Sequence, residues 1–566
     1  MFRNWSRVLS FIFVFACACS LPPICPAEDD DPPEKIIKKY ATAPMDQDQR
    51  ETAIRKVAKE DSLEGMKILA PLLGDPFAHI HEVVIRAIDK TQNTDAIKFL
   101  AENFMLTAKE DLARANTARV LGIIGNVEAA KGLTRALTDR NLLVRTSAAE
   151  ALGVLKSADA AKALTDRLKD PAPPVRYAAA LALGRIGDAS AQDALAKQLG
   201  DNTWEGRAGA LAGLALVAPE AVIEHANKML ADKDYQVRIA AVEALFEAQR
   251  TAEARDAAFA GAVKALEDKA WQVRAAAIAY LVEIWEKRCI DPLIEQISKE
   301  NGRLRLDTVF ALKELTGADM GMTQQAWKGW WESKKEEYEL PKERDKKSDR
   351  KADDKATTAA FCRLPIYSDR MMFILDLSGS MKNPPKRGTE DGTNEPKDDG
   401  KKDPGDKDEG KFERKIDIAA AEMENTIAQL PKEARFNVMV YRYYTAYPPR
   451  IEVNTAFKGS IQPAVDGNKK QAQAFVKKQE PLGWGAFFDA IVAAFEDPEL
   501  DTIFLLSDGV PSRGTHVNSQ EIVDAIVEMN RYRRIVIHTV MTGDVGTDAE
   551  FMRKLAAATG GMMAKR

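Results

Sequence analysis

Apolar residues follow two different periods along this chain, and the change between them divides it in two. Between residues 46 and 317 they recur every three to four positions, in segments rich in alanine and leucine. That spacing places them on one face of a helix and predicts amphipathic helices. From residue 367 onward, short apolar runs alternate with helical segments. This alternation predicts a mostly parallel sheet covered by helices on both faces.

The helical half repeats itself. Residues 139–145, 170–176 and 232–238 each form a D-x-x-x-x-V-R turn, and an alanine-rich helix follows each turn. A fixed period of about 30 residues indicates a solenoid, because one helix pair cannot bury its own apolar face. The last residue of the turn marks the register along the chain: Arg50, His81, Arg114, Arg145, Arg176, Arg207, Arg238, Arg274 and Arg305. The pattern resembles HEAT and HEAT-like (PBS lyase type) repeats, which implies an α-solenoid of helix pairs.

The repeated arginine has two interpretations. A ladder of guanidinium groups would bind anions, whereas pairing with the repeated aspartate would stabilise the stacking of the units. We favour the structural pairing. The repeats end where Trp327, Trp330 and Trp331 fall on one helical face. We interpret this segment as a terminal cap, because the last unit has no neighbour to cover it.

In the second half, the order of strands and helices predicts a doubly wound, Rossmann-type sheet. The main strands are expected at Met371–Leu375, Phe436–Tyr443, Thr502–Leu506 and Ile535–Met541, with an edge strand at Arg450–Asn454 and a short last strand at Met562–Ala564. The first of these strands runs into Asp376, Ser378 and Ser380, spaced as D-x-S-x-S, and the third ends at Asp508. Ligands of open α/β sheets bind at the carboxyl ends of strands. Carboxylate and hydroxyl oxygens there suit a hard divalent cation.

This arrangement resembles the von Willebrand factor type A (VWA) domain and its metal-ion-dependent adhesion site. The resemblance covers residues 367–566 and implies that Asp376, Ser378, Ser380 and Asp508 hold Mg²⁺, or Mn²⁺ or Ca²⁺. The family also supplies a threonine ligand, and here Gly485 stands at that position. The resemblance therefore implies a partial site with weak affinity for the metal. The alternative is that the two serines only cap the turn after the strand.

The first residues have the features of an export signal. A positive start with Arg3 and Arg7 precedes an apolar stretch too short to span a bilayer comfortably. We expect a signal peptide over residues 1–27 and a periplasmic, envelope or secreted location. Cys17 and Cys19 leave open a lipidated or uncleaved N-terminus associated with the membrane. Outside this leader only two cysteines occur, and we expect a buried thiol at Cys289 rather than a disulfide.

Charged, apolar-poor segments separate the expected domains. We assign residues 28–45 to a spacer, 46–333 to the solenoid with its tryptophan-rich cap, 334–366 to a charged linker and 367–566 to the VWA-like domain. Residues 382–414 form a charged insert just after the D-x-S-x-S loop, in which we expect disorder.

Composition narrows the functional classes. The formal net charge is −5, so nucleic acid is not the expected partner. We predict a non-catalytic interaction or adhesion-type protein, whose solenoid and metal-bearing domain engage an unidentified protein through its carboxylate. One alternative is an envelope scaffold whose metal site is degenerate. A less favoured alternative is a hydrolase using Asp376 and His516, although neither a G-x-S-x-G nor a G-x-x-x-x-G-K-[ST] motif is present.

Overall fold

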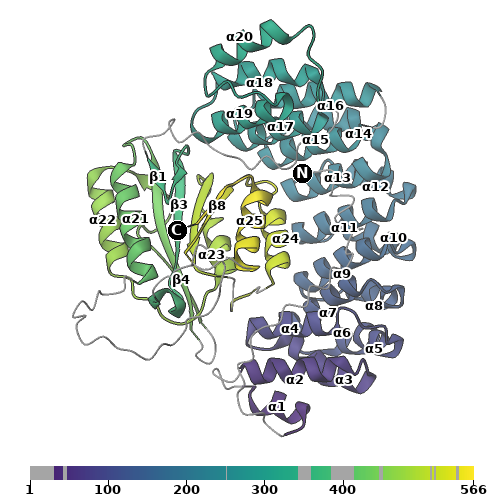
Figure 1. Ribbon diagram of the computed structural model, residues 1–566. Coiled ribbons are helices and arrows are strands. Elements are labelled where there is room, and N and C mark those ends of the chain that lie inside the picture. Colours follow the sequence, from purple (N-terminus) through teal and green to yellow (C-terminus); the bar gives the residue numbers. More distant parts are fainter. Residues whose placement is uncertain are drawn as a thin grey trace, which may run out of the picture. The chain divides into compact units, whose positions relative to one another are not determined.

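The computed structural model describes residues 31–41, 47–249, 252–341, 359–383, 414–444, 450–509, 513–515, 518–542 and 547–565. The chain divides into two compact units, residues 1–346 and 347–566 (Figure 1). The first is the helical solenoid and the second is the sheet domain. The expected signal peptide, most of the expected insert and His516 lie outside the described residues.

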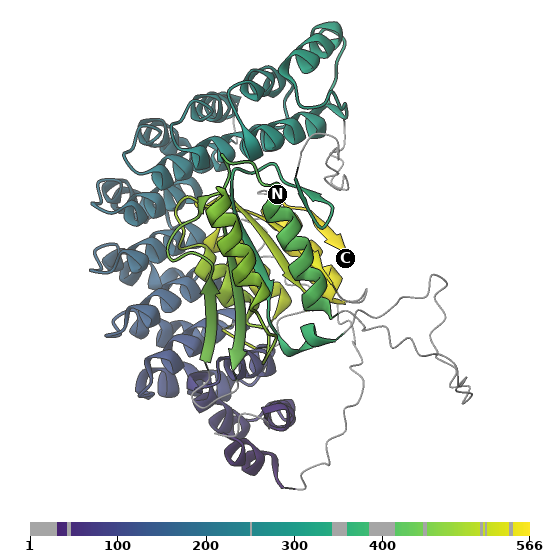
Figure 2. The same cartoon turned by 90° about the vertical axis from the view of Figure 1, so that its left-hand side faces the viewer.

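The solenoid is built from helices joined by short turns, seen stacked in Figure 2. Its α-helices are α1 (Pro33–Lys39), α2 (Gln47–Lys59), α3 (Leu63–Leu69), α4 (Ala78–Ile88), α5 (Thr94–Lys98), α6 (Met105–Thr107), α7 (Asp111–Ile124), α8 (Ala130–Ala136), α9 (Leu142–Leu155), α10 (Ala161–Arg167), α11 (Pro173–Ile186), α12 (Gln192–Gln198), α13 (Trp204–Val217), α14 (Pro219–Met229), α15 (Tyr235–Glu247), α16 (Ala252–Ala265), α17 (Trp271–Ile284), α18 (Ile290–Ile297), α19 (Gly302–Thr316) and α20 (Gln324–Lys334). Single-turn segments complete it: η1 (Ala70–Gly74), η2 (Phe99–Phe104), η3 (Val127–Ala129), η4 (Ala158–Ala160), η5 (Ala189–Ala191) and η6 (Lys287–Cys289).

The second helix of each unit packs against the second helix of the next. This row runs through α7, α9, α11, α13, α15, α17 and α19. Glycine at the same place in successive units allows the close approach. A Cβ atom on Gly153 would lie 2.8 Å from the Cα of Ala182, and one on Gly184 would lie 2.9 Å from the Cα of Gly213. The repeat period therefore sets the spacing of the stack as well as its hydrophobic face.

The repeated arginine pairs with an acidic residue of the following unit. The pairs are Arg50–Asp75, Arg114–Asp139, Arg145–Asp170, Arg176–Asp201, Arg207–Asp232, Arg238–Asp268 and Arg274–Glu300. In the Arg145–Asp170 pair the two side chains are only 10% and 1% exposed. This confirms the structural interpretation of the arginine ladder.

One end of the solenoid agrees with the prediction from the sequence, and the other end does not. Trp327 and Trp331 are buried on α20, which packs on α18, and Trp331 donates to the Asp291 carboxylate at 2.9 Å. The expected cap is therefore present. At the other end, the expected spacer contains helix α1, because Ile36 and Ile37 are buried where α1 packs on α2. Two apolar residues in a short polar segment were too weak a signal for a helix.

The sheet domain contains a two-stranded hairpin and a seven-stranded mixed sheet. Its strands are β1 (Ala360–Phe361), β2 (Leu364–Pro365), β3 (Arg370–Asp376), β4 (Arg435–Tyr444), β5 (Arg450–Thr455), β6 (Gln462–Pro463), β7 (Thr502–Ser507), β8 (Val536–Met541) and β9 (Met563–Lys565). Its helices are η7 (Gly379–Lys382), α21 (Lys415–Gln429), α22 (Asp466–Lys477), α23 (Phe487–Ala494), α24 (Ser519–Met529) and α25 (Thr547–Thr559).

The strand order is β5-β4-β3-β7-β8-β9, with β6 also paired to β4. All pairs along β4-β3-β7-β8-β9 are parallel, whereas β5 and β6 run antiparallel to β4. The expected doubly wound fold, including the edge strand β5 and the short last strand β9, is confirmed. The carboxyl ends of β3, β4 and β7 consequently lie at one edge of the sheet, which we call the rim.

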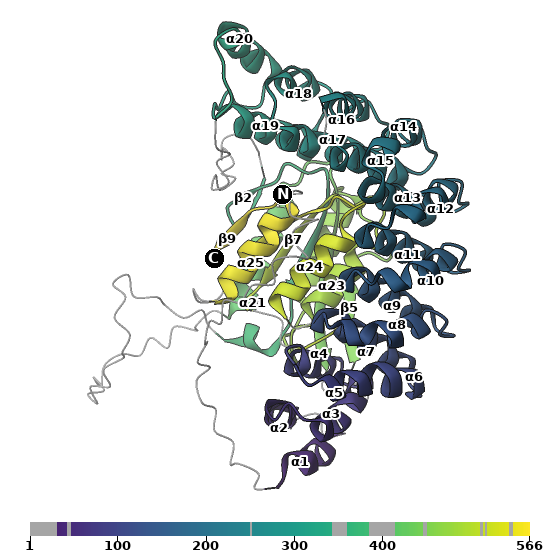
Figure 3. The ribbon, with the colours of Figure 1, turned by 90° about the vertical axis from the view of Figure 1, so that its right-hand side faces the viewer.

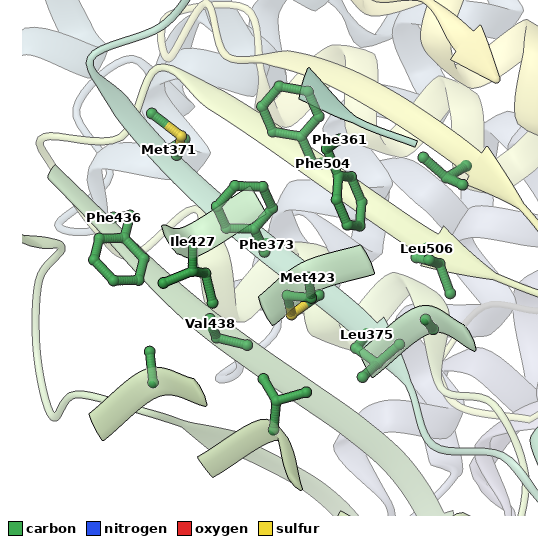
Figure 4. Packing of buried hydrophobic residues seen from close by; sticks show 14 of the residues in the cluster. Phe361, Met371, Phe373, Leu375, Met423, Ile427, Phe436, Val438, Phe504 and Leu506 are labelled. Atoms are coloured by element: carbon green, nitrogen blue, oxygen red, sulfur yellow. The ribbon is translucent and has the colours of Figure 1, made fainter. Parts of the chain in front are cut away.

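Two apolar cores cover the two faces of this sheet. Side chains of α21 and α22 fill one core, and side chains of α23, α24 and α25 fill the other. Figure 3 shows the second set of helices against the sheet. In the first core, Phe373 of β3 stacks on Phe504 of β7 with ring centroids 5.4 Å apart (Figure 4). A strand buried on both faces is uniformly apolar, which is why β3 and β7 were visible in the sequence.

The sheet domain begins earlier than the expected boundary at residue 367. Strands β1 and β2 form a hairpin whose turn residues, Cys362 and Arg363, have φ of +49° and +69°. Phe361 is fully buried and packs edge-on against Phe373 (Figure 4). Residues 359–366 were assigned to the linker because they follow a long charged stretch, but their apolar side chains belong to the core of the sheet domain.

Candidate functional site

Three neighbouring strands bring the predicted site residues to the rim. Strand β3 ends at Asp376, β4 places Tyr441 beside it in parallel register, and β7 ends one residue before Asp508. Asp376, Ser378, Ser380 and Asp508 therefore gather in one place, as expected from the strand order. These four residues contribute two carboxylates and two serine hydroxyls to the rim.

Asp376 lies at the bottom of the site and is only 4% exposed. Its Oδ1 accepts the amide of Ser378 at 2.7 Å, and its Oδ2 accepts the hydroxyls of Ser507 at 2.7 Å and Tyr441 at 3.0 Å. Burial raises the pKa of Asp376; the Ser507 hydrogen bond opposes this, and the Asp508 charge adds to it. This carboxylate is thus held in one orientation in a place where a nearby positive charge would stabilise its ionised form.

A chain of oxygen atoms leads from this buried carboxylate to the surface. The Ser378 and Ser380 hydroxyl oxygens are 3.0 Å apart, and the Ser380 hydroxyl donates to Asp508 Oδ1 at 2.9 Å. Ser378 is buried, whereas Ser380 is exposed. A small ion arriving from solvent would therefore meet Ser380 first.

The side chain of Ser378 does not have the capping role that was its alternative explanation. Ser378 occupies the N-cap position of η7, yet its side chain makes no capping hydrogen bond. Its hydroxyl instead pairs with Ser380. A serine at an N-cap ordinarily accepts a backbone amide of the first turn. The Ser378 hydroxyl therefore faces the other oxygens of the site and not the amides of the first turn.

A lysine also reaches the site. The Lys415 ammonium lies 2.8 Å from Asp508 Oδ2, and the two side chains are 13% and 6% exposed. Lys415 is the first residue of α21, and its amide donates to the carbonyl of Asn383 at 3.1 Å. The two described ends of the expected insert, Asn383 and Arg414–Lys415, therefore lie together beside the rim.

The segment Leu482–Gly485 supports the loop that carries the serines. Leu482 donates its amide to the carbonyl of Leu377 at 2.8 Å, and Gly379 donates its amide to the carbonyl of Gly483 at 2.9 Å. At the position where the family supplies threonine, a Cβ on Gly485 would lie 3.5 Å from Asp376 Oδ2. The position is therefore beside the site, and glycine leaves it without a side-chain ligand.

The donor set favours a hard cation over a transition metal. Among the described residues, no group of three or more His, Cys, Asp and Glu side chains is placed to hold a metal ion. The rim offers two carboxylates and two hydroxyls, which suit Mg²⁺, Mn²⁺ or Ca²⁺ rather than Zn²⁺. The oxygen atoms present suit such an ion in kind, with the threonine oxygen missing and a lysine close by.

Three residues of the site were not predicted from the sequence. Tyr441 and Ser507 hold Asp376, and Lys415 pairs with Asp508. Tyr441 is the strand neighbour of Asp376 and Ser507 directly precedes Asp508, so strand alignment gives a signal for both. Lys415 follows a long charged segment, where one lysine among many has no distinguishing pattern.

The second half of the chain contains two histidines, His516 and His538. His538 is buried in β8, where its ring stacks on Phe504 and its Nδ1 accepts the Met562 amide at 3.0 Å. It is a packed core residue. His516 lies outside the described residues. Cys289 is a buried thiol outside any disulfide, as expected, and burial raises its pKa to about 12.

Comparison with family models identifies both halves of the chain. HEAT repeats match at residues 103–184 and 143–215, and a von Willebrand factor type A domain matches at residues 410–564. The chain thus carries HEAT repeats followed by a VWA domain. Domains of both kinds are generally protein-interaction modules. The VWA match includes Lys415, Gly485 and Asp508, and it begins after the D-x-S-x-S segment.

Solved structures with similar architecture are distant. The complex of CpcE and CpcF of phycocyanin lyase from Nostoc sp. PCC7120 is 23% identical, with 47% of this chain and 92% of that chain covered and a TM-score of 0.26. An engineered protein is 20% identical, with 54% and 99% covered and a TM-score of 0.29. A search of curated proteins finds no match. In the part of the chain that the structure describes, no helix has the length and apolar character to cross a bilayer.

Proposed function

We propose that this chain is an exported, non-catalytic interaction protein whose VWA domain binds a hard divalent cation at the rim. The ion, Mg²⁺ in the first instance, would be held by Ser378 and Ser380, with Asp376 and Asp508 supplying negative charge. A carboxylate of a partner protein would complete its coordination. The solenoid would contribute a second contact surface.

The observation that carries this proposal is the oxygen chain at the rim. The Ser378–Ser380 and Ser380–Asp508 oxygen separations are 3.0 Å and 2.9 Å. Oxygens at adjacent corners of an octahedron around Mg²⁺ are about 2.9 Å apart, because each metal–oxygen bond is about 2.05 Å. Each of these two separations matches that of neighbouring positions around one ion, although the present contacts are hydrogen bonds.

The buried residues would act by orientation and charge. Tyr441, Ser507 and the Ser378 amide fix both oxygens of Asp376, so the loop geometry is set before any ion arrives. When bound, the ion would act as a Lewis acid that attracts an anionic oxygen from solvent or from a partner. The absence of a threonine oxygen at Gly485 leaves one more position for water, which supports weak binding of the ion.

Apolar side chains next to the site support a protein partner. Leu482 and Trp484 are 49% and 38% exposed, and they flank Gly483, which holds the serine loop. The Arg513 guanidinium lies over the Trp484 ring, 4.7 Å from its centroid. Aromatic side chains are enriched at interaction surfaces. A partner presenting a carboxylate beside an apolar side chain would match this surface.

The solenoid also carries exposed apolar residues in register. Leu112 of α7 and Leu143 of α9 each lie two residues before the repeated arginine, and they are 45% and 54% exposed. Leu142 is 42% exposed next to Leu143. Equivalent positions in adjacent units form a continuous strip in a stacked repeat. This strip is the part of the solenoid we assign to partner contact.

The alternatives differ from this proposal in what the rim does. An envelope scaffold would need no ion, and Gly485 together with Lys415 is the observation in its favour. A hydrolase would need Asp376 to reach substrate, but Asp376 is buried and both its oxygens accept hydrogen bonds. The interaction function is the one that the exposed serine and the adjacent apolar surface support best.

The test is calorimetric titration of the full mature chain with Mn²⁺ and Mg²⁺, compared with Ser380→Ala. Ser380 is exposed, so its loss should leave the fold intact while removing one ligand. We expect millimolar binding by the natural chain and at least about tenfold weaker binding by the variant. Ser460→Ala, which removes a hydroxyl elsewhere in the same domain, is the matched control. No heat with either metal at millimolar concentration would favour the scaffold.

Partner binding is tested separately with the same three proteins immobilised. Each is exposed to cell-envelope extract with Mg²⁺ and with a chelator. We expect one set of captured proteins that requires both Mg²⁺ and Ser380. If every captured protein is retained with the chelator, the rim has no part in partner binding and the solenoid alone would carry it.

A further inference from the structure

The rim already contains a positively charged group of the protein itself, the Lys415 ammonium. Asp508 uses both of its oxygens: Oδ1 accepts the Ser380 hydroxyl at 2.9 Å, and Oδ2 lies 2.8 Å from the Lys415 ammonium. With side-chain exposures of 13% and 6%, this ion pair is shielded from solvent. Pairs of this kind differ from exposed pairs, whose contribution to stability is close to zero.

The lysine balances charge that the rim would otherwise leave uncompensated. Asp376 is buried close enough to Asp508 for the two negative charges to oppose each other. The positive charge beside Asp508 offsets this repulsion, and a divalent ion at the serines would do so as well. Lys415 and the ion would therefore act on the same carboxylate, and each would lower the affinity of the rim for the other.

We infer that Lys415 is an internal competitor for the divalent cation, so that the rim alternates between a lysine-paired state and an ion-bound state. This inference rests on the proposed function and deepens it. It assigns the weak affinity to two causes, the missing ligand at Gly485 and the ammonium on Asp508. It also places the switch at Lys415, the first residue of α21.

The lysine is suited to exchange because of how it is attached. An ammonium group makes point contacts on a flexible four-carbon stem and is strongly hydrated in water. The neighbouring Arg414 is anchored independently, with contacts to Asp417 at 2.8 Å and Glu480 at 2.9 Å. Lys415 can therefore leave Asp508 by rotating its side chain while the start of the helix stays in place.

The experiment compares the natural full chain with Lys415→Met and Lys382→Met. Methionine keeps an unbranched apolar stem and removes the charge. Lys382, at the end of η7, is exposed, so its replacement controls for net charge near the same loop. Lys415→Gln is the second variant at the site, in case methionine disturbs packing. Each protein is titrated with Mn²⁺ by calorimetry, and its thermal midpoint is measured with a chelator and with saturating Mn²⁺.

We expect Mn²⁺ affinity to rise about tenfold in both Lys415 variants, equivalent to a competitor worth about 1.4 kcal/mol, and to change less than about twofold in Lys382→Met. With the chelator the Lys415 variants should melt below the natural chain, and Mn²⁺ should reverse that loss. Equal affinity in all variants would overturn the competition while leaving the metal site standing. Binding by the Lys415 variants alone would support the competition and refute metal binding by the natural rim. No binding by any variant would overturn both.

Discussion

Two aspartates, one in each half of the molecule, pair with basic residues in different ways. In the solenoid, Asp170 receives both Nε and Nη2 of Arg145 at 2.8 Å and the amide of Ala172 at 3.0 Å. At the rim, Asp508 forms an ion pair with one lysine and accepts a hydrogen bond from one serine hydroxyl. The first carboxylate is held by a planar fork from the preceding repeat. The second is held by a flexible ammonium and an exposed hydroxyl.

The contrast separates a structural ion pair from an exchangeable one. A bidentate guanidinium–carboxylate pair fixes geometry as well as charge, and its repetition through the solenoid makes it part of the stack. A single ammonium contact imposes little geometry. Both pairs are shielded from solvent, so burial alone does not distinguish a structural pair from an exchangeable one. The number and rigidity of the contacts make that distinction.

Removing an arginine from the ladder should have the largest effect on stability. Arg145→Ala removes the bidentate partner of Asp170, whose side chain is 1% exposed, and leaves only the longer contact with Arg167 at 3.6 Å. Loss of one partner of a buried pair costs about 3–5 kcal/mol. Chemical denaturation followed by circular dichroism would measure it. Arg140→Ala is the control, because the Arg140 side chain is 76% exposed and should contribute less than about 1 kcal/mol. Similar losses in both variants would contradict a structural role specific to the buried ladder.

Breaking the rim pair should cost less. Asp508→Asn removes the carboxylate facing Lys415, but the ammonium can turn to solvent, so we expect a loss of about 2 kcal/mol, below the range for fully buried pairs. The thermal midpoint of the full chain in a chelator reports this change. Glu528→Gln removes a negative charge from an exposed position on α24 and serves as the control. A loss as large as that of Arg145→Ala would mean that the rim pair is as fixed as the ladder.

Acid should weaken the ladder. Burial by itself would raise the pKa of Asp170, but hydrogen bonds from Arg145 and the Ala172 amide outweigh it, and the net pKa is below its ordinary value. A carboxyl whose pKa is lower when folded binds fewer protons than in the unfolded chain. Its stabilising contribution is therefore complete above the ordinary carboxyl pKa of about 3.9 and is lost as pH falls below it.

Denaturation curves of the natural chain and Arg145→Ala between pH 2.5 and 6 test this sign, taken at about half-unit steps across the carboxyl range. The natural chain should lose stability steeply at the acid end. The variant should lose less, because its Asp170 keeps only the weaker influence of Arg167 and its pKa is lowered less. Parallel curves for the two proteins would rule out the Arg145 contribution.

Restoring the missing ligand should affect metal affinity more than stability. A Cβ on Gly485 would make only ordinary contact with Asp376, so Gly485→Thr should fold and add a hydroxyl beside the site. We expect about tenfold tighter Mn²⁺ binding and a change in unfolding free energy below about 1 kcal/mol. Gly485→Val has the same shape without the hydroxyl. If valine raises the affinity as much as threonine, the gain does not come from a ligand.

The sequence predicted those parts of the molecule that repeat or that are buried on both sides. The arginine register gave the stack and the position of each ion pair, because the same unit occurs many times. The apolar runs into Asp376 and Asp508 gave the strands and placed both carboxylates at one edge, because parallel strands share their carboxyl ends. Helix α1 and the β1–β2 hairpin were not predicted. Each depends on a few apolar residues, such as Phe361, within polar surroundings.

Three residues of the site were not predicted because they depend on contacts between distant parts of the sequence. Tyr441 and Ser507 act through strand register, which follows only after the pairing of β3 with β4 and β7 is known. Lys415 reaches Asp508 across more than ninety residues of sequence, and its neighbours in the charged segment have similar composition. Long-range pairs of one ordinary lysine with one aspartate have no local pattern in a single sequence.

The most direct test of the central claim is a Mn²⁺ anomalous difference map from crystals of the full chain grown with saturating Mn²⁺. The account predicts a peak within coordination distance of the Ser378 and Ser380 hydroxyl oxygens, with the Lys415 ammonium moved away from Asp508. Absence of a peak at the rim, with Lys415 still paired to Asp508, would contradict it.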